Sequence, residues 1–217
     1  MLHQQIRTNV SQLGWASAAT YLLARLVARV SRGRVRLLCY RLVAQRVPAS
    51  AAAHCRPGQS NRVRTVDATD PVVAQFPRPP EVTARRFAGF IWLARSHYEE
   101  DEVRCRYVLA QPDDCAWDYD VYVDPSLRMG RTFARLWDAA NAHLAERSIR
   151  WTLSRISAFN PGSLAAHGRL DIHHIGTALF LTFNRLQLSL FSQSPFIHLS
   201  VRAGSRPTLR LHPPPVP

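Results

Sequence analysis

Residues 117–147 read WDYDVYVDPSLRMGRTFARLWDAANAHLAER, and they decide the fold class. Polar and apolar residues alternate over 117–123, which predicts a half-buried β-strand. Over 131–147 the large apolar residues recur with the 3.6-residue period of an amphipathic helix. A strand that passes through a polar turn into a helix is typical of proteins that mix strands and helices along the chain.

The segments on either side add further strands and helices. Apolar runs and alternating patterns predict strands, and capping residues predict helices. The predicted strands lie at 87–94, 103–109, 151–158, 177–183, 186–191 and 196–201, and the predicted helices at 13–30 and 160–170. We therefore expect an α/β fold (α+β, with a mixed sheet) in which helices are threaded between the strands.

The turn at 124–131 carries the most informative chemistry. The first backbone N–H groups of a helix have no partner within the helix, and they favour anions. Gly130 removes a Cβ where a phosphate would approach the backbone, and Arg128 and Arg131 add charged donors. One glycine and two arginines also precede many ordinary capped helices, so these residues alone leave a phosphate site and a capped turn both open.

Two segments of the chain, in their order along the sequence, resemble the GNAT superfamily of acyl-CoA-dependent N-acyltransferases. Residues 119–131 resemble its central strand and pyrophosphate loop, and residues 156–167 resemble its next strand and asparagine-led helix. The resemblance covers roughly residues 62–201. It implies a central, mostly antiparallel sheet with a splayed parallel pair, flanked by helices. It also implies an N-acyltransferase that moves an acetyl or short acyl group from CoA to an amine.

The resemblance further implies where acetyl-CoA, or another acyl-CoA, would bind as co-substrate. The central strand would offer backbone groups to pantetheine, and the turn would cradle the diphosphate. The residues concerned are Val121, Tyr122 and Val123 in the strand, Leu127, Arg128, Met129, Gly130, Arg131 and Thr132 in the turn, and Asn160 and Ser163 in the second helix. The acceptor would be an amine of a small molecule or a protein, and no metal is expected.

Three side chains are candidates for proton transfer. Asp118 and Asp120 are expected on one face of the central strand, where repulsion between two carboxylates raises one pKa and suits a general base. His167 stands where the family often carries a tyrosine that protonates the departing thiolate, and an imidazolium can donate a proton near neutral pH. Solvated or arginine-paired acids and a surface histidine are the alternative interpretations.

The acidic run at 99–102 also has two interpretations. Four consecutive carboxylates would attract a cationic acceptor through their field. The simpler alternative is a charged, solvated hairpin loop.

All 28 cations of this 217-residue chain are arginines, and the formal net charge is +13. The lack of lysine excludes a Schiff-base lysine and a P-loop. The charge is +11 over residues 1–66, −6 over 67–124 and +8 over 125–217. Arginines that are not interleaved with exposed aromatic residues disfavour a nucleic-acid binder, so no nucleic-acid partner is expected.

The basic residues 1–61 are expected to have a different role from the residues that follow them. Residues 1–61 are interpreted as a helical extension and linker, 62–203 as the acyltransferase-like domain, and 204–217 as a proline-rich, disordered tail. Residues 34–47 fit either a longer helix or a strand. The helix at 13–30 would lie on an anionic membrane surface or dock on a protein surface. A non-catalytic CoA-binding or structural module, tethered through this helix, is therefore the alternative function.

The four cysteines are Cys39, Cys55, Cys105 and Cys115, and they form no C-x-x-C pair and no zinc-binding pattern. Free thiols of this kind are typical of a reducing compartment. Because no secretory leader with a cleavage site is evident either, we expect a cytoplasmic protein. A position at the inner membrane face stays open through the basic helix.

Overall fold

A computed structural model gives the fold, and it describes residues 15–49, 63, 65, 66, 69 and 88–215. The chain divides into two compact units. The first unit comprises Met1–Arg46, Ala94–Trp117 and Trp151–Pro217, and the second comprises Val47–Leu93 and Asp118–Arg150.

The described elements alternate between strands and helices, which confirms a mixed α/β fold with a mixed sheet. In chain order they are α2 (Trp15–Val30), β1 (Val35–Arg46), β2 (Gly89–Ala94), β3 (His97–Glu99), β4 (Arg106–Leu109), β5 (Cys115–Val123), the 3-10 turn η3 (Pro125–Leu127), α4 (Thr132–Ala145), β6 (Trp151–Ser157), α5 (Pro161–Gly168), β7 (Ile172–Phe183), β8 (Leu186–Phe191), β9 (Ile197–Ser200) and β10 (Thr208–Leu211).

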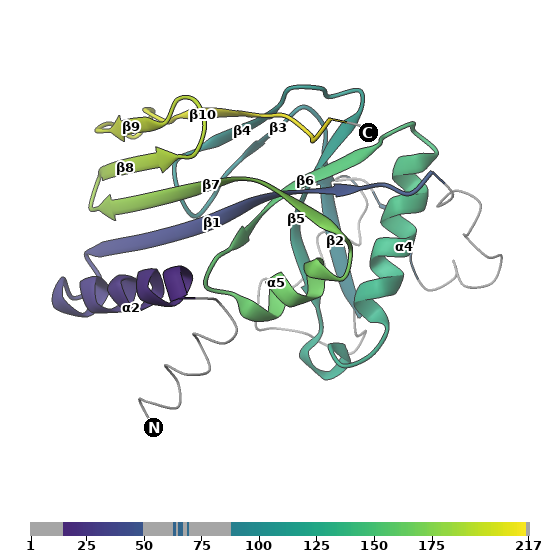
Figure 1. Cartoon of the computed structure of the whole chain (residues 1–217), viewed down its shortest axis with the longest axis horizontal. Coiled ribbons are helices and arrows are strands. Elements are labelled where there is room, and N and C mark those ends of the chain that lie inside the picture. The colour runs from purple at the N-terminus through teal and green to yellow at the C-terminus, as the bar shows by residue number, and fades with distance from the viewer. Residues whose placement is uncertain (1–14, 50–62, 64, 67–68, 70–87, 216–217) are drawn as a thin grey trace. The chain divides into compact units, whose positions relative to one another are not determined.

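The main sheet of the first unit has the strand order β5-β6-β1-β7-β8-β9 (Figure 1). Strand β1 pairs antiparallel with β6 on one side and with β7 on the other. Strands β7, β8 and β9 continue as an antiparallel meander. A two-residue loop at Asn184 and Arg185 joins β7 to β8, and Asn184 adopts a left-handed φ of 51°, as is common in tight hairpin turns.

Strand β1 lies inside the sheet, and this differs from the prediction that residues 1–61 form an extension outside the domain. Tyr40 pairs with both Ser157 and Ala178, and it is almost completely buried. The acyltransferase-like domain predicted at 62–203 therefore lacks a strand that the sheet contains. Helix α2, which precedes β1, does confirm the predicted helix at 13–30, and it lies against β1 (Figure 1). The linker predicted within 1–61 lies largely outside the described residues.

A second sheet in the same unit has the strand order β10-β4-β3. Strand β10 pairs parallel with β4, and Leu209 and Leu211 are completely buried. The prediction of a disordered tail at 204–217 is therefore wrong for residues 208–211. Two leucines at alternate positions supply enough apolar surface to fasten a short strand between proline-rich flanks.

The core of the first unit gathers aromatic residues from β3, β4 and β5. Trp117 is fully buried, and its ring stacks on Tyr107 and Tyr98 at centroid distances of 4.8 and 5.8 Å. The alternation predicted for 103–109 is confirmed in burial, because Val103, Cys105, Tyr107 and Leu109 are all buried.

The second unit contains β2, the later part of β5, η3 and α4. Strand β2 lies so close to β5 that a Cβ on Gly89 would stand 2.3 Å from the carbonyl oxygen of Tyr122, so only glycine fits there. Phe90 stacks on Tyr122 and Trp92 on Tyr119, at centroid distances of 5.4 and 6.5 Å. The predicted strand, turn and helix over 117–147 are thus confirmed as β5, η3 and α4.

Candidate functional site

The turn between β5 and α4 is built by local hydrogen bonds. Asp124 caps η3, because its carboxylate accepts from the backbone N–H of Ser126 at 2.9 Å. The guanidinium Nε of Arg128 donates to the carbonyl oxygen of Val123 at 3.0 Å. Arg128 therefore has a positioning role at the end of β5, and it occupies a carbonyl that the sequence analysis assigned to pantetheine.

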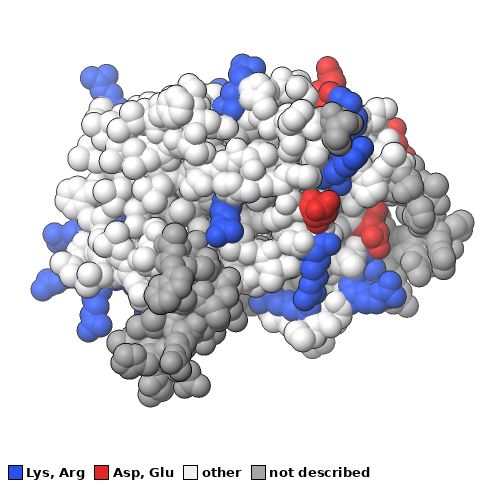
Figure 2. All heavy atoms as spheres, viewed as in Figure 1, with Lys and Arg blue, Asp and Glu red and all other residues white. Residues whose placement is uncertain are grey.

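The start of α4 is a cationic surface. Arg131 occupies the N-cap position without a side-chain capping bond, so the dipole end of the helix is not neutralised by its own cap. Residues 125–131 are exposed, and Figure 2 shows arginine side chains gathered around this turn. Gly130 is a point of close approach, because a Cβ there would lie 3.3 Å from the Leu127 carbonyl oxygen. This arrangement can bind an anionic group at the surface.

The two aspartates of β5 do not share an environment, contrary to the prediction. Asp118 is buried, with 3% of its surface exposed, whereas Asp120 is exposed. Asp120 adopts a left-handed φ of 48°, which interrupts the regular alternation of the strand. Burial, together with the charge of Asp120, raises the pKa of the neighbouring Tyr119. Asp120 is therefore the accessible carboxylate of the two.

Helix α5 holds the remaining predicted site residues, in the first unit. The Asn160 side chain accepts from the backbone N–H of Ser163 at 3.0 Å, which confirms the predicted cap. His167 is buried, and burial lowers its pKa to about 4. The imidazole is therefore neutral at pH 7, so the predicted role of an imidazolium acid and the alternative of a surface histidine both disagree with this environment.

Strands β5 and β6 pair in parallel. Their pairing extends over three residue pairs, from Cys115 with Trp151 to Trp117 with Leu153. Beyond Leu153, β6 keeps its antiparallel partner β1 as far as Ser157.

Arginines contact part of the acidic run 99–102, whereas the side chain of Asp101 stays 72% exposed. Glu100 is buried and receives two hydrogen bonds of 2.6 Å from Arg155. Arg155 also lies 3.4 Å from Glu102 and over the ring of Tyr40, whose hydroxyl donates to Glu102. This cluster was not predictable from local sequence patterns, because 55 residues separate Glu100 from Arg155.

No metal centre emerges from the part of the chain that the structure describes. Within it, no three His, Cys, Asp or Glu side chains lie together as ligands. Cys39, Cys105 and Cys115 form no disulfide, and Cys55 lies outside the described residues.

The predicted site residues therefore fall into two groups. Asp118, Asp120 and the turn residues belong to the second unit, whereas Asn160, Ser163 and His167 belong to the first. The chain matches no family model, no curated protein and no solved structure. No relative therefore supplies a function by similarity.

Proposed function

We propose that the chain is an acyl-CoA-dependent N-acyltransferase of the GNAT type. The observation that carries the proposal is the cationic turn at the start of α4, whose N-cap has no side-chain capping bond. The diphosphate of CoA carries the charge that such a turn favours, and two exposed guanidinium groups can each contact phosphate oxygens in a bidentate manner. The co-substrate would thus be recognised first by its phosphates.

The short parallel pairing of β5 and β6 supports the same proposal. A parallel pair that continued to the end of both strands would use up the backbone groups that the family offers to pantetheine. Here the pairing of β5 with β6 ends at Leu153. From there to Ser157, β6 remains paired with β1.

The reaction needs little covalent participation by the protein. The amine nitrogen attacks the thioester carbonyl carbon, the carbon–sulfur bond breaks, and CoA leaves as a thiolate that takes up a proton from solvent. Asp120, the exposed carboxylate, would remove the proton from the attacking ammonium, directly or through water, with the buried Asp118 as the second candidate. A backbone N–H near Val123 would polarise the carbonyl, and positioning supplies much of the remaining acceleration.

A non-catalytic CoA-binding module is the second candidate, and His167 favours it. A neutral, buried imidazole is a poor acid for a departing thiolate, so the second proton-transfer group that the resemblance implied has no equivalent at this position. The two candidates differ in turnover and agree in CoA binding.

Titration calorimetry of acetyl-CoA into the full chain tests the shared step. We expect Gly130→Glu to weaken binding at least tenfold, because a carboxylate would face the diphosphate, and Arg131→Gln to weaken it less. Arg147→Gln, which removes an exposed arginine near the other end of α4, is the matched control and should bind as the parent does. An absence of binding by the parent chain, or unchanged affinity of the glutamate variant, would refute the turn as the diphosphate site.

Release of free CoA thiol in the presence of a panel of amines then separates the two candidates. An enzyme should release thiol, and Asp120→Asn should lower turnover about 10²-fold with little change in acetyl-CoA affinity. Binding without thiol release from any amine of the panel would favour the non-catalytic module.

A further inference from the structure

Helix α2 presents its bulky apolar side chains to solvent. Leu22, Leu26 and Val30 follow one another at four-residue spacing, and Leu26 and Val30 are 57% and 77% exposed. Ala24 and Ala28, on the other side of the helix, are only partly exposed. A surface helix of an isolated globular protein has the opposite arrangement, with its larger apolar residues turned inward. The outward leucines therefore point to a partner.

The sheet beside α2 has an exposed apolar face as well. Residues directly opposite each other in antiparallel strands share a face, so Leu37, Leu181, Leu188 and Leu199 form one continuous row. The neighbouring rows are also apolar, and they contain Phe183, Leu186, Leu190 and Ile197. Leu199 and Ile197 are 59% and 62% exposed. Figure 2 shows a broad uncharged area over β7, β8 and β9.

The exposed helix and the exposed sheet face meet. A shallow hollow between them is lined by Val30, Ser31, Arg32, Arg34 and Phe183. We call the exposed apolar residues of α2 and of the outer rows, together with the adjoining arginines, the basic apolar surface. An exposed apolar area of this extent is typical of a protein or membrane interface.

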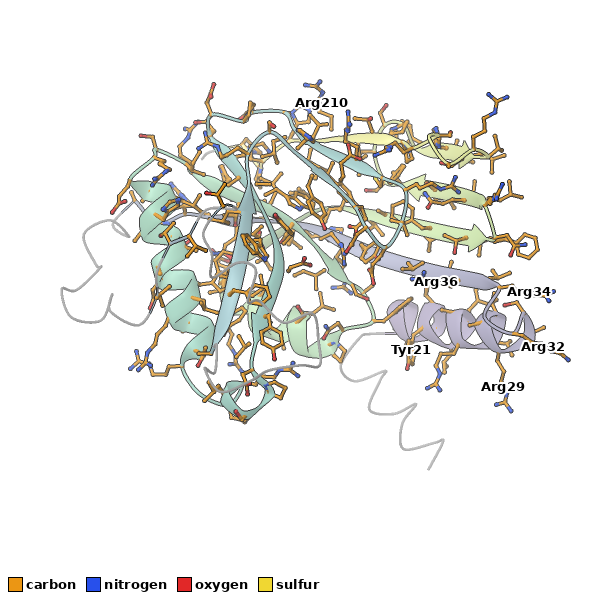
Figure 3. All side chains as sticks on the ribbon, turned by 180° about the vertical axis from the view of Figure 1, so that it is seen from behind. Tyr21, Arg29, Arg32, Arg34, Arg36 and Arg210 are labelled. Carbon is orange, nitrogen blue, oxygen red and sulfur yellow. The ribbon has the colours of Figure 1, made fainter. Side chains whose placement is uncertain are left out.

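The charges beside this surface have one sign. Arg25, Arg29, Arg32 and Arg34 are exposed, and Figure 3 shows Arg29, Arg32 and Arg34 projecting from the end of α2 and the turn after it. Residues 1–66 contain no acid, and these arginines make no ion pair among the described residues. The partner therefore has to combine an apolar phase with negative charge.

We propose that the basic apolar surface docks on an anionic lipid bilayer. Leucine, isoleucine and phenylalanine side chains would enter the boundary between headgroups and acyl chains, and the guanidinium groups would bind lipid phosphates and carboxylates. None of the described helices is long and apolar enough to cross a membrane, so contact at the bilayer surface accounts for these residues. A second copy of the chain fits less well, because a two-fold interface repeats one patch and brings arginines with no acid between them.

Co-sedimentation of the full chain with vesicles tests this proposal, independently of any acyltransferase activity. Vesicles of phosphatidylcholine alone are compared with vesicles of phosphatidylcholine and phosphatidylserine in a three-to-one ratio, at low and high salt. We expect binding to the phosphatidylserine vesicles that weakens at high salt. Arg25→Gln with Arg29→Gln should weaken it about 25-fold, since each arginine near an anionic surface contributes roughly fivefold. Leu22→Ser with Leu26→Ser should weaken it at least tenfold.

The matched control removes two exposed arginines elsewhere, as Arg147→Gln with Arg169→Gln, and should bind as the parent does. Circular dichroism verifies that each variant is folded. The salt dependence of the parent chain needs no variant, so a folding failure does not remove the test. No binding by the parent, equal binding to both vesicle types, or equal loss in the control would overturn the proposal. So would a stable dimer in sedimentation velocity without vesicle binding, which would assign the surface to a second copy.

Discussion

On each face of the β1-β7-β8-β9 sheet, some residues depart from the usual rule that polar side chains are exposed and apolar side chains are buried. On the inner face Gln187, Ser189 and Ser200 are buried although they are polar. On the outer face Leu199 and Ile197 are exposed although they are apolar. The comparison teaches that burial in this sheet is decided by what packs over each face rather than by hydropathy.

The inner face tolerates polar residues because each finds a partner. The Gln187 side chain accepts from the Arg104 backbone N–H at 2.8 Å and donates to the Arg104 carbonyl at 2.7 Å and to Ser189 Oγ at 3.0 Å. Arg104 in turn donates to the backbone carbonyls of Arg202 and Arg185. Hydrogen bonds of this kind offset the cost of removing a polar group from water. Among the described residues, the outer face instead carries exposed apolar side chains such as Leu199 and Ile197.

The largest expected effect comes from the charges packed behind the inner face. Arg155→Leu should lower the free energy of unfolding by about 3–5 kcal/mol, because it leaves the buried Glu100 carboxylate without a cation. Urea denaturation measures the loss. The double variant Arg155→Leu with Glu100→Leu should recover much of it, and equal losses in both variants would show that the ion pair is not the cause.

A second expected effect depends on pH and concerns His167. Its folded pKa of about 4 lies below the ordinary value of 6.5, so the unfolded chain takes up a proton that the folded chain refuses. The free energy of unfolding should therefore be constant above pH 6.5 with respect to this group, and it should fall by about 3 kcal/mol as the pH drops toward 4. His167→Gln should flatten this part of the stability profile in thermal melts, and an unchanged profile would contradict the prediction.

The smallest expected effects come from single substitutions that compare the inner and outer faces of the sheet. Gln187→Leu makes the inner face more apolar, yet it should destabilise the chain by about 1–3 kcal/mol, because Arg104 loses both backbone partners. Leu199→Gln makes the outer face more polar and should change stability by less than about 0.5 kcal/mol, because Leu199 is exposed. Chemical denaturation of both variants measures the difference, and a larger loss in Leu199→Gln would mean that the outer face is part of the core.

The local structure was predictable wherever the sequence carries its own periodicity. The alternation in β5 and the 3.6-residue period of α4 depend on neighbours a few residues apart, so both were identified. Strand β1 was ambiguous, because its mixture of arginines and aliphatic residues fits a helix as well as a strand. Strand β10 was not predicted, because its two leucines lie among prolines and form a strand only by pairing with the distant β4.

The candidate site was predictable in part. The turn, its arginines and the Asn160 cap follow from residue types that act on their nearest neighbours. The left-handed φ of Asp120 and the burial of His167 were not predictable, because they depend on how distant segments pack. The same holds for the ion pair between Glu100 and Arg155, which lie 55 residues apart in the chain.

The position of β1 has a consequence for how the chain acquires its fold. Arg46 at the end of β1 pairs with Trp151, so the strand waits for partners that lie about a hundred residues further along the chain. Distant pairing of this kind raises contact order and slows folding toward milliseconds or longer. During translation β1 emerges well before β6 and β7, so its pairing with either strand has to wait until that strand has left the ribosome.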